Sequence, residues 1–525
     1  GKNPGGYWGA VGYYTLVQLA SKQGDFPALA EAFRNIEIQE LPSSLRPKLL
    51  LTMGNAQRKQ EQYVQAIETY ATAEEYYATS DEAVEEGYLK LICFYKVGDQ
   101  DLPAFVANYV LNMTKRGKRT FIDRALLLAA EQHFSNRNFE AAGSSYASIE
   151  PQNIPKQIRP SMLYNRGWCE NEIGLYRQAS LTLTSFLTDF PDHELAPSVY
   201  ASRGLAYRQL GDRASALRDF THILEHYPDT AAAEMAFQQS GLVYGEQREW
   251  LSMITAFDAL IEKFPESIAL AEAHFFSGKG RFDLKRFTEA IPLLRKSVEL
   301  DDSYFPRAQL RIVLCNYFLQ NTDQLSKEID LFFDKNPEGT IDAKVLSWLG
   351  ASRFEENAFP AAAKYLRLGV TPDKPESTLP IVWMYLAQAE SKSGLHEGAI
   401  QAINFYLDFT NHPTSRARGF LIKTQTHLAA GNLDEADEAA REGLMIQKEG
   451  RINAELLIAQ GDVSMARKDY QDAAAKYIVV SEIFEDSVIT PSAMEKAAQA
   501  YQEAGMAQEA KQVRKDLAKR FPREG

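Results

Sequence analysis

The chain has 525 residues, of which 45% are hydrophobic and 24% charged, and its formal net charge is −13. A chain of this length cannot form around one compact core, so it must contain several domains or an array of repeats. Its composition excludes a disordered acidic tail, and no run approaches the roughly 18 apolar residues that a direct membrane span needs. Acidic and basic residues are interspersed, which argues against nucleic acid as a partner because phosphate binding needs a dense basic face.

A repeat of 37 residues runs through the chain, marked by a small or apolar residue early in a helical segment. Leu29 and Ala66 are 37 residues apart, and one degenerate unit around Leu102 fills the gap before Ala142. The marker then recurs in steps of 37, with a single step of 35, at Ala179, Ala216, Met253, Ala290, Leu325, Ala362, Ala399, Ala436, Ala473 and Ala510. The spacing predicts about fourteen units. We group them as N-terminal, partly degenerate units over 1–120, central units over 121–340, and C-terminal units with a capping helix over 341–525.

Each unit is expected to form two amphipathic helices joined by a tight turn. A glycine in the first helix would let the neighbouring helix come close, and it recurs at Gly54, Gly167, Gly204, Gly241, Gly278, Gly350 and Gly461. A second glycine marks the turn, where a positive φ is expected, at Gly24, Gly98, Gly174, Gly211, Gly394, Gly431 and Gly505. A proline stops the second helix at Pro191, Pro228, Pro265, Pro337 and Pro522. Thr230 and Ser267 are placed to cap the following helices. One hairpin cannot bury its apolar face alone, so the units must stack.

The segment 200–228, YASRGLAYRQLGDRASALRDFTHILEHYP, resembles a tetratricopeptide repeat almost position by position. The matching residues are Tyr200, Gly204, Tyr207, Gly211, Ala216, Phe220, Ile223 and Pro228. The period departs from the usual 34 residues, because three extra residues lie between the proline and the next first helix. The resemblance implies an all-α fold, an α-solenoid of about fourteen helix–turn–helix units forming a superhelix. Within this superfamily, the longer unit with its FP-x-(S/T) closure is similar to periplasmic Tol–Pal coordinator proteins and outer-membrane-assembly lipoproteins.

The same resemblance implies that the first helices line a groove that binds a partner. The residues carried over to this groove are Tyr164, Trp168, Asn171, Arg208, Gln238, Phe275, Lys279, Phe282, Arg307, Tyr317, Lys344 and Phe354. This set is rich in aromatic side chains with scattered cations, and it does not place lysine and asparagine at the fixed positions in successive units that a clamp for a C-terminal carboxylate needs. It therefore favours an extended or helical segment with apolar anchors as the ligand. The alternative is that these aromatic side chains pack against neighbouring first helices.

Neither the cysteines nor the histidines indicate a catalytic, metal or cofactor site. Cys93, Cys169 and Cys315 each lie two residues after the first-helix glycine position, where other units place alanine. They are expected to be small, buried and unreactive. His222 and His226 have helical spacing, but they lack both a third ligand and the HExxH arrangement.

The sequence thus favours a non-catalytic scaffold or adaptor that binds peptide or protein partners in its groove as part of a bacterial envelope assembly. The implied location is periplasmic or outer-membrane-associated, and no cofactor is expected. The alternatives are a cytoplasmic chaperone or peptide receptor, or a regulatory subunit whose catalytic part lies elsewhere. The sequence leaves the oligomeric state open.

Overall fold

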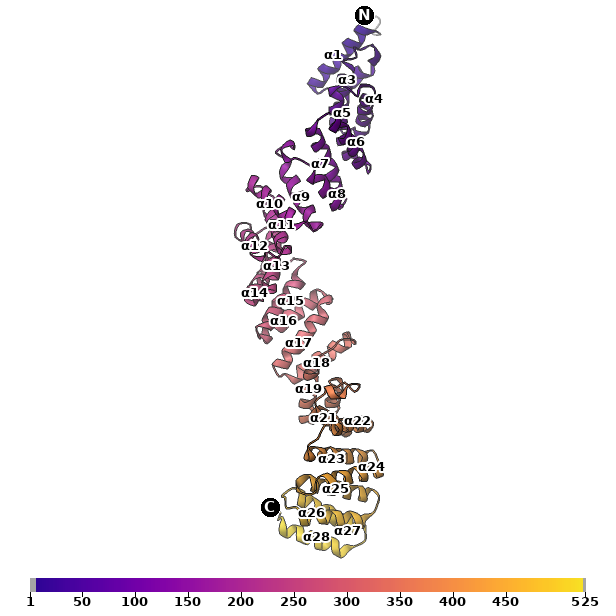
Figure 1. Cartoon of the computed structure of the whole chain (residues 1–525), viewed down its shortest axis with the longest axis vertical. Coiled ribbons are helices and arrows are strands. Elements are labelled where there is room, and N and C mark those ends of the chain that lie inside the picture. Colours follow the sequence, from indigo (N-terminus) through magenta and orange to yellow (C-terminus); the bar gives the residue numbers. More distant parts are fainter. Residues whose placement is uncertain (1–5, 523–525) are drawn as a thin grey trace. The chain divides into compact units, whose positions relative to one another are not determined.

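The computed structural model describes residues 6–522, and this part of the chain contains 28 α-helices, four short 3₁₀ helices and no strand. The all-α prediction is confirmed, and the 28 helices form the fourteen hairpins that the repeat predicts (Figure 1). The first helices of the hairpins are α1 (Tyr7–Gln23), α3 (Arg46–Lys59), α5 (Asp81–Val97), α7 (Arg119–Ser135), α9 (Arg159–Glu172), α11 (Ala196–Gln209), α13 (Ala231–Glu246), α15 (Leu270–Asp283), α17 (Phe305–Phe318), α19 (Ala343–Glu355), α21 (Pro380–Lys392), α23 (Pro413–Ala429), α25 (Gly450–Ala466) and α27 (Ile489–Glu503).

The second helices return antiparallel to the first. They are α2 (Phe26–Arg34), α4 (Tyr63–Tyr77), α6 (Leu102–Lys115), α8 (Phe139–Ala147), α10 (Tyr176–Asp189), α12 (Arg213–His226), α14 (Trp250–Lys263), α16 (Phe287–Leu300), α18 (Thr322–Lys335), α20 (Phe359–Leu368), α22 (His396–Asp408), α24 (Leu433–Ile446), α26 (Tyr470–Ile483) and α28 (Ala507–Arg520). The 3₁₀ helices η1 (Ile38–Glu40), η2 (Pro151–Asn153), η3 (Asp302–Tyr304) and η4 (Pro375–Ser377) lie in connections between hairpins.

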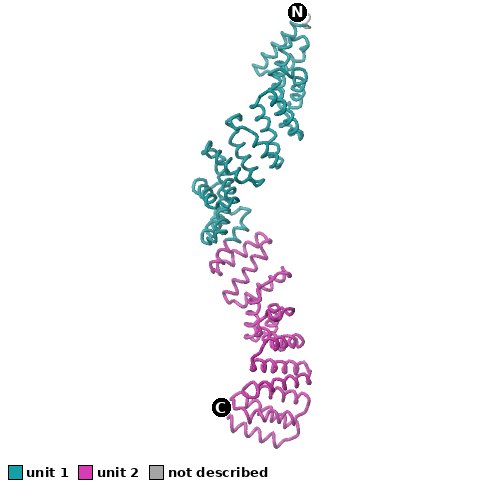
Figure 2. Tube along the Cα trace, in the orientation of Figure 1, with its two compact units in different colours: residues 1–276 teal, residues 277–525 magenta. Residues whose placement is uncertain are grey.

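The chain divides into two compact units, residues 1–276 and 277–525 (Figure 2). In the first unit, α11 packs on its partner α12, on the preceding α10, and on the neighbouring first helices α9 and α13. In the second unit, α23 packs in the same way on α22, α24, α21 and α25. Each hairpin is thus stabilised mainly by its neighbours along the chain. The division into three groups of repeats remains a prediction.

The first-helix glycines bring the two helices of a hairpin into close contact. A Cβ atom built on Gly204 would lie 2.4 Å from a ring carbon of Phe220, and one on Gly241 would lie 2.6 Å from the ring of Phe257. In every case the obstructing side chain lies 16 residues later, on the second helix. The other pairs are Gly54–Tyr70, Gly167–Leu183, Gly278–Leu294, Gly350–Leu366 and Gly461–Tyr477. The predicted role of these glycines is confirmed.

The turns inside the hairpins share one backbone conformation, whichever residue occupies them. The turn glycines have φ between 72° and 80°, as predicted. The other seven hairpins in residues 6–522 place a non-glycine residue at the same position with φ between 55° and 65°. These residues are Glu61, Arg137, Arg248, Lys285, Gln320, Asn357 and Lys468. The left-handed turn therefore belongs to every hairpin, and the glycine pattern revealed only half of its occurrences.

This shared geometry gives a direct stability prediction. Replacing Arg248, whose φ is 60°, with glycine should stabilise the α13–α14 hairpin by about 0.5–1 kcal/mol, because a side chain is strained in the left-handed region. Replacing Gly211, whose φ is 79°, with alanine should destabilise the α11–α12 hairpin by a similar amount. Chemical denaturation followed by circular dichroism measures both. A loss of stability in the Arg248→Gly variant would contradict the strain argument.

The ends of the second helices follow the proline pattern, but one predicted cap is wrong. Helix α12 ends at His226, two residues before Pro228, as expected. Thr230 precedes α13, yet its hydroxyl donates to the carbonyl of Tyr227 at 2.8 Å and caps no amide of α13. Ser267 accepts a hydrogen bond from the amide of Ala269, at 3.0 Å, one residue before α15 begins. The hydroxyl of Thr230 instead satisfies a carbonyl at the preceding helix end.

Candidate functional site

All twelve groove residues predicted from the sequence lie on first helices. In residues 1–276, α9 carries Tyr164, Trp168 and Asn171, while Arg208, Gln238 and Phe275 lie on α11, α13 and α15. In residues 277–525, α15 carries Lys279 and Phe282, α17 carries Arg307 and Tyr317, and α19 carries Lys344 and Phe354. Each residue therefore lies on the helix that the repeat register assigns to it. The twelve residues differ in how exposed they are and in which side chains they contact.

On α9, the two aromatic residues contact each other and remain partly exposed. The rings of Tyr164 and Trp168 meet edge to face with centroids 6.0 Å apart. The amide of Asn171 donates to the carbonyl of Ser202 on α11, at 2.9 Å, so it ties two neighbouring first helices together. Trp168 is thus accessible to a ligand, whereas Asn171 already has a structural partner.

The polar groove positions on α11 and α13 are engaged in contacts between hairpins. Arg208 forms an ion pair with Glu246 at 2.8 Å, and Arg213 reaches the same carboxylate at 3.1 Å. Burial alone would raise the pKa of Glu246, but hydrogen bonds from the two guanidinium groups hold that pKa below its ordinary value. Gln238 donates to Glu272. These side chains link successive first helices.

Phe275 lies in the core. Its side chain is only 2% exposed, and its ring contacts that of Phe276 with centroids 5.4 Å apart. At this hairpin, the residue predicted to face the groove therefore lies in the hydrophobic core.

In residues 277–525 the aromatic groove residues continue from one hairpin to the next. Tyr317 on α17 contacts Trp348 on α19 edge to face at 5.3 Å. Phe354 on α19 contacts Tyr385 on α21 at 5.3 Å, and Phe282 on α15 lies 6.4 Å from Phe318 on α17. We call Phe282, Tyr317, Trp348, Phe354 and Tyr385 the aromatic row, and all five are partly exposed.

Trp348 and Tyr385 were missed by the sequence reasoning, although a signal was present. They are 37 residues apart, so they occupy one register position in consecutive hairpins. They come from a first-helix position that contributes none of the twelve predicted groove residues, and only the packing shows that they join the row.

Cations border the aromatic row. Lys392 lies over the ring of Phe359 at 4.4 Å and over that of Phe354 at 5.7 Å. Lys279 pairs with Asp283 at 2.7 Å, and Lys344 is exposed. Arg307 lies over the ring of Tyr304, 4.9 Å from its centroid. Aromatic faces and positive charge therefore occur together on these first helices, as cation–π recognition needs.

The three cysteines and the pair His222 and His226 take part in the packing of the helices. All three cysteines are fully buried, and burial raises the pKa of Cys93 to about 11 and of Cys169 and Cys315 to about 12. Their predicted position as small, buried core residues is confirmed, and a raised thiol pKa disfavours the reactive thiolate. The rings of His222 and His226 stack with centroids 4.2 Å apart. Among residues 6–522, no three histidine, cysteine or acidic side chains are grouped to hold a metal ion. No helix in this range is long and apolar enough to cross a membrane.

Comparison with known proteins identifies the repeat. Residues 203–230 match the model of the tetratricopeptide repeat family. No curated protein matches the chain. Similar solved structures include a MamA protein (15% identity, 34% of this chain and 91% of that one, TM-score 0.28). A tetratricopeptide repeat protein from Parabacteroides merdae (14%, 67% and 98%, 0.30) and yeast Tom70 (17%, 92% and 100%, 0.25) are also similar.

Proposed function

We propose that this chain, in which residues 203–230 match the tetratricopeptide repeat family, is a non-catalytic scaffold that binds peptide or protein partners on its first helices. The observation that carries the proposal is the aromatic row of residues 277–525. Its side chains keep part of their surface in solvent although Tyr317 contacts Trp348 and Phe354 contacts Tyr385 across hairpins. Aromatic side chains held in a fixed, partly exposed position are typical anchors for a partner, since little conformational entropy is lost when they bind.

The preferred partner is a segment with apolar anchors and a polar or acidic edge. Lys392 and Lys344 supply positive charge beside the aromatic faces of α19 and α21, whereas the chain as a whole is acidic. Positive charge localised beside the row would favour an approaching segment of opposite sign. We place the protein in a bacterial envelope assembly, on the similarity of its long repeat unit to periplasmic members of the superfamily.

The binding face can be tested with one variant and a matched control. Phe354→Ala removes an aromatic ring from the row, and we expect it to weaken partner capture at least tenfold. Leu300→Ala removes an apolar side chain that is more exposed than Phe354, at 44%, from the second helix α16, and capture should be unchanged. The measurement is affinity purification from the native organism with quantitative mass spectrometry, alongside a thermal melt of each variant. Equal capture by all three proteins would contradict a binding site on the first helices.

The proposed location has a separate test. Protease added to intact cells, to cells with a permeabilised outer membrane, and to lysed cells distinguishes the compartments. We expect digestion to begin once the outer membrane is permeabilised. Digestion only after lysis would instead support the alternative, a cytoplasmic chaperone or peptide receptor.

A further inference from the structure

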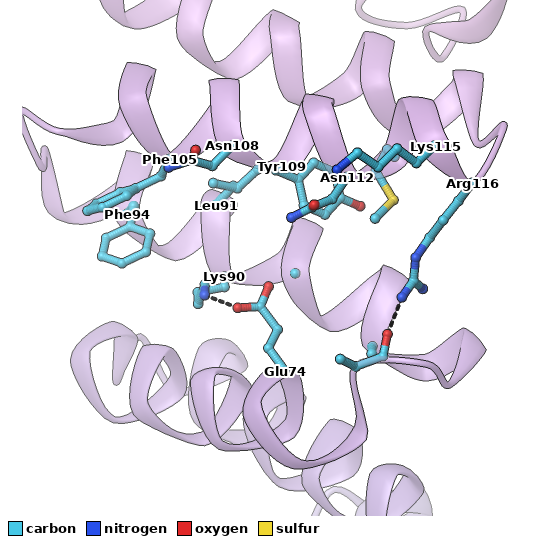
Figure 3. Close-up of a pocket in the computed structure, with 14 residues that line it drawn as sticks. Glu74, Lys90, Leu91, Phe94, Phe105, Asn108, Tyr109, Asn112, Lys115 and Arg116 are labelled. Carbon is cyan, nitrogen blue, oxygen red and sulfur yellow. Dashed lines mark hydrogen bonds and ion pairs between the residues drawn. The ribbon is translucent and has the colours of Figure 1, made fainter.

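A cavity of about 520 Å³ lies within residues 6–276 (Figure 3). It is lined by the second helices α4 and α6 and by the first helix α5. Its apolar lining comes from Leu91, Phe94, Phe105 and Met113. The volume lies within the range of ligand-binding pockets. The cavity belongs to the degenerate repeat around Leu102, and its one first helix, α5, carries none of the residues of the proposed binding face.

The sequence explains why the cavity exists at this hairpin. Leu91 lies 37 residues after Gly54, so it occupies the position at which a glycine admits the second helix in other hairpins. The marker Leu102 lies 36 residues after Ala66, one fewer than the usual step, so the counterpart of the large buried Tyr70 is here Val106, a smaller buried side chain. Leucine on α5 and valine on α6 thus replace the glycine and the large side chain at this contact, and Tyr109 of α6 instead lies over Gly87 of α5, where an added Cβ would be 2.8 Å from its ring. Phe94 and Phe105 meet at 4.5 Å, and the hydroxyl of Tyr109 donates to the carbonyl of Val84 at 2.7 Å.

The polar lining of the cavity is predominantly cationic. Lys90, Lys115 and Arg116 face a single acidic residue, Glu74, in a chain whose net charge is −13. Glu74 forms an ion pair with Lys90, and Arg116 donates to the carbonyl of Ala78 (Figure 3). A positive pocket on an acidic protein attracts and orients a ligand of negative charge.

The helix α6 contributes three polar side chains that remain available for a ligand. Asn108, Asn112 and Lys115 are exposed, and none of them has a hydrogen-bond or ion-pair partner within residues 6–522. Their spacing of four and three residues places them along one face of α6, as Figure 3 shows. Two amide groups and one ammonium group along this wall can donate several hydrogen bonds to one carboxylate.

We propose that this cavity binds an acidic segment of a partner protein, an Asp or Glu side chain flanked by an apolar residue. The carboxylate would accept hydrogen bonds from Lys115, Asn112 and Asn108, and the apolar neighbour would lie against Phe94, Phe105 and Met113. This inference rests on the proposed function only in that the occupant is a protein. Failure of the cavity test would leave the Phe354 experiment on the first helices unaffected.

Met113 provides a direct probe of the cavity, because it is one of 10 methionines and lines the apolar wall. The full chain is labelled with [¹³C]methyl methionine and titrated with the blocked tripeptide acetyl-Leu-Asp-Leu-amide. The uncharged isostere acetyl-Leu-Asn-Leu-amide serves as the control ligand. We expect the Met113 methyl resonance to shift with the aspartate peptide, with a Kd on the order of millimolar for so small a ligand, and at least tenfold more weakly with the asparagine peptide.

Two variants complete the experiment. Lys115→Gln removes the unpaired ammonium group and should weaken binding of the aspartate peptide at least fivefold. Lys96→Gln removes an exposed lysine of α5 that does not line the cavity, and binding should be unchanged. Equal shifts with both peptides, no shift with either, or full binding by Lys115→Gln would overturn the proposal. An equal Met113 shift with acetate alone would show a general anion site and would also overturn it.

Discussion

Replacing Gly204 with alanine will destabilise the α11–α12 hairpin by about 1–3 kcal/mol, the usual cost of overpacking a well-packed contact. The direction is informative, because glycine-to-alanine changes inside a helix normally stabilise it by about 0.8–1 kcal/mol. Here the new methyl group would lie 2.4 Å from the ring of Phe220, which is fully buried. The ring cannot withdraw without moving α12 away from α11.

Gly12 offers a control for the helix-propensity contribution. It lies inside α1 with no heavy atom within 4 Å of an added Cβ, so Gly12→Ala should be stabilising. Hydrogen exchange of amides in each hairpin is the suitable measurement, because a repeat array need not unfold in one step. The double variant Gly204→Ala/Phe220→Ala should be less destabilised than the sum of its single variants, since the clash is removed with the ring. Simple additivity would contradict the close-contact explanation.

The second large effect is expected at Glu86, a fully buried carboxyl group on α5. Neither of its oxygens has a hydrogen-bond partner within residues 6–522. Burial, together with the smaller effect of the nearby carboxylates of Glu82, Glu74 and Glu85, raises its pKa to about 8. The corresponding residue one repeat earlier, Leu49, is a fully buried leucine. We therefore expect Glu86→Leu to stabilise this part of the chain, because it removes an unsatisfied polar group from the core.

The effect of Glu86 depends on pH, with a defined sign. The carboxyl group is neutral in both states below its ordinary pKa of 4.5. Between that value and about 8 it ionises only in the unfolded chain, so stability falls as pH rises through this window and levels off above it. At about 1.4 kcal/mol for each tenfold change in proton affinity, the total loss is of the order of 4 to 5 kcal/mol.

Hydrogen exchange of α5 measured at several pH values, corrected for intrinsic exchange, tests this prediction. Glu86→Leu should remove the decline in protection between pH 5 and 8. Glu75→Gln, which neutralises an exposed carboxylate on α4, should retain it. The same pH dependence in wild type and Glu86→Leu would show that another group is responsible.

The sequence predicted which helices carry the candidate binding face. It did not predict which of the side chains there are exposed and which are buried or already engaged in contacts. A residue's number within the repeat decides which helix carries it, so all twelve groove residues lie on first helices. The position within the repeat does not determine how much of a side chain is buried by the neighbouring hairpins. Phe275 is therefore buried, Arg208 is engaged with Glu246, and Trp348 joins the aromatic row without having been predicted.

The sequence by itself determined the repeating features of this protein: the hairpins, the close contact at Gly204 and the left-handed turn at Gly211. These depend on interactions within one hairpin, where spacing along the chain fixes which side chains meet. Only the tertiary structure decided the features that depend on the exact separation of helices. Leu91 reveals a degenerate repeat in the sequence, but the cavity beside it and the isolation of Glu86 arise from how α4, α5 and α6 pack. The separation of packed helices depends on the combined volume of all the side chains between them. A periodic pattern in the sequence does not give that combined volume.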